Sequence, residues 1–122
     1  MTKDKLKDIL RKEAEQLPLQ EWASSGWDGY GAAPVTQQHY KDLLQLIEWL
    51  PESIDKPEIV AHPTGELALE WFKDRRKVYT ILLKDREVIY AALIGDYKNY
   101  GREALETDSS ISKNILLQYF KS

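Results

Sequence analysis

Residues 58–94 contain four short segments with strand character, and the connections between them are short. The segments are Glu58–Ala61, Glu66–Phe72, Lys77–Lys84 and Glu87–Ile94. Only Asp85 and Arg86 separate the last two segments. A two-residue connection joins antiparallel strands, because a parallel pair needs a crossover of about a dozen residues. The sequence therefore predicts an antiparallel meander.

The third and fourth of these segments carry apolar side chains on both faces. Tyr79, Ile81 and Leu83 alternate with Val78, Thr80 and Leu82. A strand that is apolar on both faces is typical of the interior of a sheet, so we expect both strands to be central and covered, or partly covered, on each side. Residues 95–108 fit either a loop or a fifth, irregular edge strand.

Three segments have the three- and four-residue spacing of amphipathic helices. The first covers Thr2–Leu17, with Thr2 or Asp4 as its N-cap and Pro18 after its end. The second covers Thr36–Leu50, with Thr36 as its N-cap and Pro51 after its end. Ser109 or Ser110 is expected to begin the third, whose apolar face is Ile111, Ile115, Leu116, Tyr119 and Phe120.

These elements predict one α+β domain over residues 1–122, in the order α-loop-α-β-β-β-β-α, with helices flanking a four- to five-stranded antiparallel meander. The chain has no cysteine, which excludes a disulfide scaffold, a thiol nucleophile and a Cys-ligated metal. No apolar run reaches the roughly 20 residues of a membrane span, and the charged N-terminus does not resemble a signal peptide. We therefore expect a cytoplasmic protein without membrane contact.

The common catalytic motifs are absent from the sequence, which has no GxxxxGK[ST], HExxH or GxSxG segment. His39 and His62 are the only histidines, and we expect them to be surface or capping residues, with no metal and no cofactor. An acid-catalysed hydrolase would need Asp28 or Glu70 in a cleft with a raised pKa. The sequence does not favour an enzyme.

Residues 20–34 combine three glycines with the large side chains of Trp22, Trp27 and Tyr30. Disordered linkers are poor in aromatic residues, so we expect an ordered loop. Two interpretations stay open. In one, Trp27 and Tyr30 pack on the strand face of Leu67, Leu69 and Trp71 while Asp28 caps backbone N–H groups of the loop. In the other, the rings stay partly exposed and bind a protein partner.

The loop and the strands after it resemble a family of small uncharacterised bacterial proteins. The motifs that carry this resemblance are the Trp27–Ala32 segment WDGYGA, the Pro57–Ile59 segment PEI, the turn Pro63-Thr64-Gly65, and the Leu67–Trp71 strand LALEW. They span residue 27 to about residue 94. Thr64 departs from the Asp or Asn that we expect in the turn. The family has no assigned activity, so the resemblance implies a fold and no function.

Charge is distributed unevenly along the chain. Residues 35–72 carry two basic and seven acidic side chains, a net charge of −5, whereas residues 73–122 carry ten and seven, a net charge of +3. The acidic residues Asp42, Glu48, Glu52, Asp55 and Glu58 are expected to steer a basic partner. The basic residues at 73–77 form too short a cluster to favour nucleic-acid binding.

Together these features predict a non-enzymatic protein-binding protein of bacterial or phage origin, of the antitoxin, immunity or counter-defence type, which acts by occupying a partner's surface. The candidate partner-binding residues are Trp22, Trp27, Asp28, Tyr30, Glu48, Glu52 and Asp55. The alternative is a small-molecule or carbohydrate binding module in which Trp and Tyr rings stack on the ligand. A homodimer through an edge strand, either Glu58–Ala61 or residues 95–106, is a further hypothesis.

Overall fold

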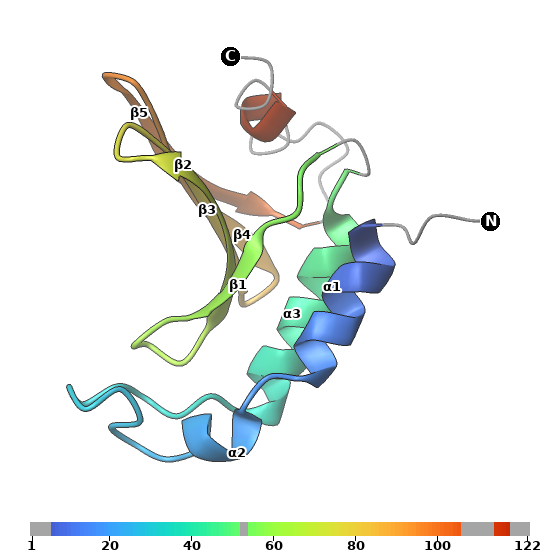
Figure 1. Cartoon of the computed structure of the whole chain (residues 1–122), viewed down its shortest axis with the longest axis vertical. Coiled ribbons are helices and arrows are strands. Elements are labelled where there is room, and N and C mark those ends of the chain that lie inside the picture. The colour runs from blue at the N-terminus through green and yellow to red at the C-terminus, as the bar shows by residue number, and fades with distance from the viewer. Residues whose placement is uncertain (1–5, 52–53, 106–113, 118–122) are drawn as a thin grey trace.

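The computed structural model describes residues 6–51, 54–105 and 114–117 of the 122-residue chain. The described residues form an α+β fold: three helices, five strands and a helical turn at 114–117 follow one another along the chain. Figure 1 shows the strands in one sheet, with α1 and α3 on the same side of it. The predicted fold class is confirmed.

Helix α1 (Leu6–Glu15) ends earlier than its apolar spacing predicted. The N–H groups of Gln16 and Leu17 bond to the carbonyls of Glu13 and Ala14, three residues back, at 3.0 and 3.3 Å. This tighter pattern closes the last turn of a helix before the chain turns away at Pro18. The predicted N-cap residues Thr2 and Asp4 lie outside the described residues.

Helix α3 (Gln37–Trp49) begins at a reciprocal cap. The Thr36 Oγ1 accepts the N–H of His39 at 3.2 Å, and the His39 Nδ1 accepts the N–H of Thr36 at 3.0 Å. Each bond satisfies a backbone donor that a helix leaves free. Thr36 as the N-cap and His39 as a capping histidine are both confirmed. The helix ends where Leu50 takes an extended conformation before Pro51.

The sheet is a meander in which every neighbouring pair of strands is antiparallel, in the order β1-β2-β3-β4-β5. Its strands are β1 (Glu58–Ala61), β2 (Leu67–Asp74), β3 (Lys77–Lys84), β4 (Glu87–Ile94) and β5 (Tyr97–Ala104). Asp85 and Arg86, with φ of 51° and 65°, form the predicted two-residue hairpin turn between β3 and β4. Two positive φ values give a turn whose twist matches the strands that it joins.

Strand β5 answers the question that the sequence left open for residues 95–108, as far as residue 105; residues 106–108 lie outside the described residues. It pairs with β4 in unbroken register from Ile94↔Tyr97 to Glu87↔Ala104, so it is a regular edge strand. The predicted last helix is described only at 114–117, where Ile115 and Leu116 are buried. Its predicted caps Ser109 and Ser110, and its residues Ile111, Tyr119 and Phe120, lie outside the described residues.

The core lies between α3 and one face of the sheet. Helix α3 contacts β2 and β3, and α1 packs against α3. Leu46 and Ile47 of α3 belong to one buried cluster with Tyr79 and Ile81 of β3. Trp71 meets the Tyr79 ring edge to face, with the ring centroids 5.9 Å apart. Among the described residues, no helix is long and apolar enough to cross a membrane.

The opposite face of the sheet has no helix over it in the described part of the chain, as Figure 1 shows. We call this surface the open face. Strand register and the alternation of side chains assign to it the apolar residues Phe72, Val78, Leu82, Ile89, Leu93 and Tyr100. Phe72 is 62% exposed and Tyr100 is 80% exposed. The prediction that β3 and β4 are central is confirmed, but the helices of the described residues cover only one of their two faces.

Candidate functional site: the aromatic loop

The aromatic loop, residues 22–35, connects α2 to α3. Helix α2 (Leu19–Trp22) is a single turn in which the N–H groups of Glu21 and Trp22 bond to the carbonyl of Pro18, each at 3.1 Å. The sequence predicted a loop from residue 20, so this turn is a correction. A four-residue helix has too few apolar positions to show a helical period.

Backbone hydrogen bonds close the loop on itself. The N–H of Gly26 donates to the carbonyl of Ala32 at 2.7 Å, and the N–H of Val35 donates to the carbonyl of Trp22 at 2.8 Å. Gly26, Gly29 and Gly31 have φ of 73°, 80° and 83°, a conformation that residues with a Cβ rarely adopt. The predicted ordered loop is confirmed.

The carboxylate of Asp28 lies inside this turn. Its Oδ1 accepts the N–H of Tyr30 at 2.8 Å and the N–H of Ala32 at 3.1 Å. These bonds are of the Asx type, in which the side chain satisfies N–H groups that no other backbone group reaches. The predicted capping role of Asp28 is confirmed.

Trp27 anchors the loop from within. Its Nε1 donates to the carbonyl of Ala33 at 2.7 Å, and its ring meets that of Trp22 with the centroids 5.8 Å apart and the planes tilted by 45°. Both rings are half-buried and pack against the hydrophobic core. Trp22 and Trp27 therefore fix the base of the loop.

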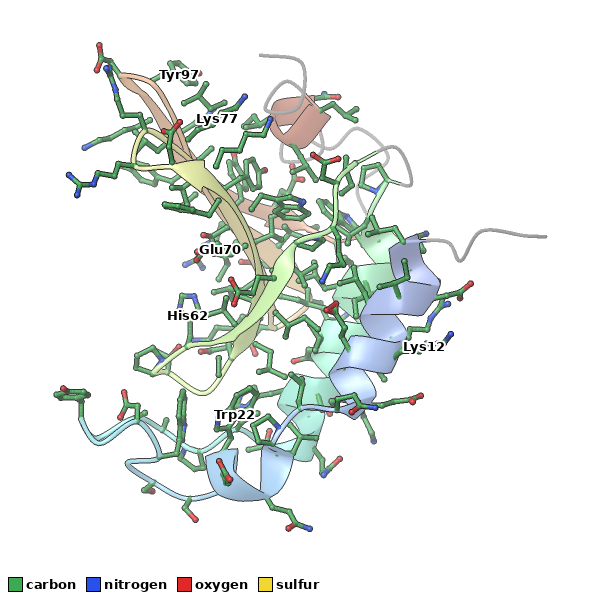
Figure 2. All side chains as sticks on the ribbon, viewed as in Figure 1. Lys12, Trp22, His62, Glu70, Lys77 and Tyr97 are labelled. Atoms are coloured by element: carbon green, nitrogen blue, oxygen red, sulfur yellow. The ribbon has the colours of Figure 1, made fainter. Side chains whose placement is uncertain are left out.

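The loop docks on the turn between β1 and β2. The N–H of Ala33 donates to the carbonyl of Pro63 at 2.7 Å, and Gly65 lies so close to Pro34 that a Cβ there would come within 2.7 Å of the Pro34 carbonyl oxygen. Figure 2 shows Trp22 and His62 together at this end of the molecule.

Tyr30 is exposed at the tip of the loop. Its side chain is 94% exposed, so the prediction that Tyr30 packs on the strand face of Leu67, Leu69 and Trp71 is wrong. Trp71 has other contacts: its Nε1 donates to the carbonyl of Asp55 at 2.8 Å. The loop thus combines a half-buried pair of rings, Trp22 and Trp27, with one exposed ring, Tyr30.

The acidic candidates lie at the other end of α3. The Glu48 carboxylate forms an ion pair with Arg11, and the Glu48 carbonyl accepts a bond from the Lys7 Nζ at 2.9 Å. Asp55 is exposed, and Glu52 lies outside the described residues. Because α3 has 13 residues, about 20 Å of helix separates these acids from the loop. The structure therefore divides the predicted partner-binding set between two distant places.

The described residues contain no group of three or more His, Cys, Asp or Glu side chains placed to hold a metal ion. Glu70 lies with Glu58 and Asp55 around a hollow of about 360 Å³ beside Trp71. Asp28 does not line this hollow; its carboxylate lies inside the turn of the aromatic loop. The two carboxylates named for a hydrolase are thus in different parts of the molecule.

Sequence reasoning missed one buried acid, Glu66, which is 7% exposed. Burial raises the pKa of this carboxyl, but hydrogen bonds from Thr64 and the backbone and the charge of Lys84 outweigh burial and lower the pKa below 4.5. The Lys84 Nζ is 3.5 Å from the Oε1, whereas the Oε2 has no hydrogen-bond partner among the described residues. The alternation of β2 placed Glu66 on the polar face, and nothing in that pattern indicates burial.

The comparisons find no match to this chain among family models, curated proteins or solved structures. The resemblance carried by the motifs therefore stays a prediction.

Proposed function

We propose that this protein binds a protein partner through the aromatic loop and acts by occupying the partner's surface, without catalysis. The observation that supports the proposal is the 94% exposure of Tyr30 at the tip of a loop whose backbone is closed by hydrogen bonds. The Tyr30 ring makes no contribution to the core, so its packing within the chain does not explain it.

A rigid loop with an exposed tyrosine suits protein recognition. Tyr has only two side-chain torsions, so a partner loses little entropy when it immobilises the ring. The Asp28 bonds and the glycine conformations fix the loop before binding, which removes part of the ordering cost of association. Tyr and Trp are also enriched among the residues that dominate binding energy at interfaces.

The acidic residues take a smaller part in this proposal. The Glu48 carboxylate is already paired with Arg11 within the chain. The distance of about 20 Å along α3 exceeds the Debye length of about 8 Å at physiological ionic strength. Glu48 and Asp55 therefore influence the approach of a partner at low salt, and the loop makes the contact.

The test compares Tyr30→Ala with Tyr97→Ala in capture of proteins from a lysate of the native host. Tyr97 is a matched control, because it is 60% exposed and lies at the opposite end of the sheet (Figure 2). We expect the wild type and the Tyr97 variant to capture the same stoichiometric partner, and the Tyr30 variant to bind that purified partner at least about tenfold more weakly. Circular dichroism should be equal for all three, since neither ring is buried.

Two results would overturn the proposal. One is equal affinity of the wild type and the Tyr30 variant for the captured partner. The other is thermal stabilisation of the wild type by a glycan or nucleotide, lost in the Tyr30 variant, which would replace a protein partner with the small-molecule module. Gene neighbourhood then tests the biological class: an adjacent toxin gene favours an antitoxin, and a phage or defence locus favours counter-defence.

A further inference from the structure

The open face carries an apolar centre between two charged borders of opposite sign. Leu82 of β3 and Ile89 of β4 lie at its centre as direct register partners. On the β1–β2 side, Glu58 and Glu70 lie on this face. On the β5 side, Lys98 and Arg102 lie on it, in register with Leu93 and Ile89. Glu87 of β4 lies on the same face and pairs with Arg102 at 3.4 Å, so this border keeps a net positive charge.

The acidic border places two carboxylates on neighbouring strands. Glu58 and Glu70 are direct cross-strand partners, and like charges at such positions are destabilising. Lys56 and Lys73 border the same hollow as these two glutamates. Among the described residues, Lys56 pairs with Glu13, and the ion pairs include neither Glu58 nor Glu70. A cationic group from outside the chain would relieve this repulsion.

We propose that the open face binds a second copy of this chain, face to face, about a two-fold axis that runs along β3. A two-fold axis in this direction places β1 and β2 of one copy over β5 and β4 of the other. Each acidic border then meets the basic border of the partner, and this contact occurs twice in the dimer.

The charge pattern also selects between the two ways of pairing the faces. A two-fold axis across the strands would place β1 over β1 and β5 over β5, so that Glu58 and Glu70 meet acids and Lys98 and Arg102 meet bases. Like charges across an interface cost several kcal/mol, which excludes this arrangement. Only the axis along the strands satisfies both borders.

The size of the face fits a small dimer interface. Four strands of eight residues, about 26 Å long, and the four-residue β1, about 13 Å long, give roughly 560 Å² per copy at a spacing of about 4.8 Å, or about 1,100 Å² in a pair. That total lies at the lower end of specific interfaces, above the roughly 1,000 Å² that they need. The strand edges stay free in this arrangement, so it differs from a dimer through an edge strand.

Two charge-reversed variants test this proposal in the full chain. One is Glu58→Lys with Glu70→Lys, and the other is Lys98→Glu with Arg102→Glu. Sedimentation velocity over a range of concentrations should show a dimer for the wild type and a dissociation constant at least about tenfold higher for each variant alone. An equimolar mixture of the two variants should restore the dimer, because both of its contacts then join opposite charges.

Circular dichroism and thermal unfolding check that each variant is folded. All four positions lie on the sheet surface rather than in the core, and Arg102 loses only an exposed pair with Glu87 at 3.4 Å. A wild type that stays monomeric overturns the proposal, as does a dimer that is unaffected by both variants or a mixture that stays monomeric. Tyr30→Ala should leave the dimer unchanged, so this test and the test of the loop fail independently.

Discussion

The most direct test of how the aromatic loop docks is the substitution Gly65→Ala. Gly65 has φ of 95°, and a Cβ there would come within 2.7 Å of the Pro34 carbonyl oxygen and 3.1 Å of the His39 Cε1. The positive φ costs about 1–2 kcal/mol for a residue with a Cβ. The contact with a backbone carbonyl adds about 1–3 kcal/mol, because the β1–β2 turn and the loop must move apart.

The matched control is Gly31→Ala, which has nearly the same backbone strain and no contact. Gly31 has φ of 83°, and a Cβ there would meet no atom within 4 Å. We therefore expect Gly31→Ala to lose about 1–2 kcal/mol of unfolding free energy and Gly65→Ala to lose about 2–5 kcal/mol. In a chain of this length, each kcal/mol lowers Tm by roughly 3–5 °C.

Urea unfolding followed by Trp fluorescence measures the difference between these two variants. Trp22 and Trp27 lie in the loop, so their emission reports its release together with global unfolding. If the two variants lose the same stability within about 0.5 kcal/mol, Gly65 does not approach Pro34 closely, and the docking of the loop on the β1–β2 turn is refuted.

Three further predictions concern single side chains. The folded chain lowers the pKa of Glu66, so the ionised carboxylate stabilises the fold above pH 4.5. Urea titrations should show that the stability difference between wild type and Glu66→Gln shrinks as pH falls below that value. Burial raises the pKa of Tyr79 far above 10, so only the unfolded chain loses this proton near pH 10; stability should fall above pH 10, and Tyr79→Phe should flatten that slope. Asp28→Ala removes the acceptor of two N–H groups, so it should lower the unfolding free energy by about 1–2 kcal/mol and weaken partner binding. Asp28→Asn keeps an oxygen at that position and should lower the unfolding free energy by less.

The sequence predicted the meander because two local signals agreed. In β2, apolar and polar side chains alternate, and in β3 and β4 apolar side chains lie on both faces. The Asp85–Arg86 connection is too short for any arrangement other than a hairpin. Helix α3 was predicted with the correct N-cap because Thr36 and Pro51 bracket a clear helical period. In these elements, local preference and tertiary structure favour the same conformation.

The segment that the sequence left open and the contacts that it missed have the opposite cause. Strand β5 mixes Lys98, Tyr100 and Arg102 with small residues, and an edge strand with one exposed face shows little apolar alternation. Burial of Glu66 depends on Lys84, a residue that becomes its neighbour only when β2 pairs with β3. The aromatic loop likewise docks on the β1–β2 turn, which is about 30 residues away in the sequence. Such contacts follow from topology, and periodicity does not show them.

The apolar second face of β3 and β4 predicts cover, or partial cover, on both sides of these strands. Figure 1 shows α1 and α3 on the other face, and no described helix lies over this one. This face carries side chains of the apolar types that usually line a covered sheet face, namely Val78, Leu82, Ile89 and Leu93. The proposed dimer supplies their missing layer from a second copy.

A two-fold axis along β3 also determines where the two aromatic loops lie. Rotation about an axis parallel to the strands does not change position along them, so corresponding strand ends of the two copies lie at the same end of the dimer. Both loops dock at the β1–β2 turn, so both Tyr30 side chains project from one end of the dimer. A surface coated densely with partner would then be bound by two loops at once.

This arrangement predicts a difference between two binding measurements. Linking two sites raises apparent affinity by a factor of about 100 or more without any new contact. The variant Glu58→Lys with Glu70→Lys should therefore bind a densely coated surface at least about tenfold more weakly than the wild type, while its affinity for soluble partner stays equal. Equal weakening in both assays would mean that the open face contacts the partner directly, and the loop would no longer account for recognition alone.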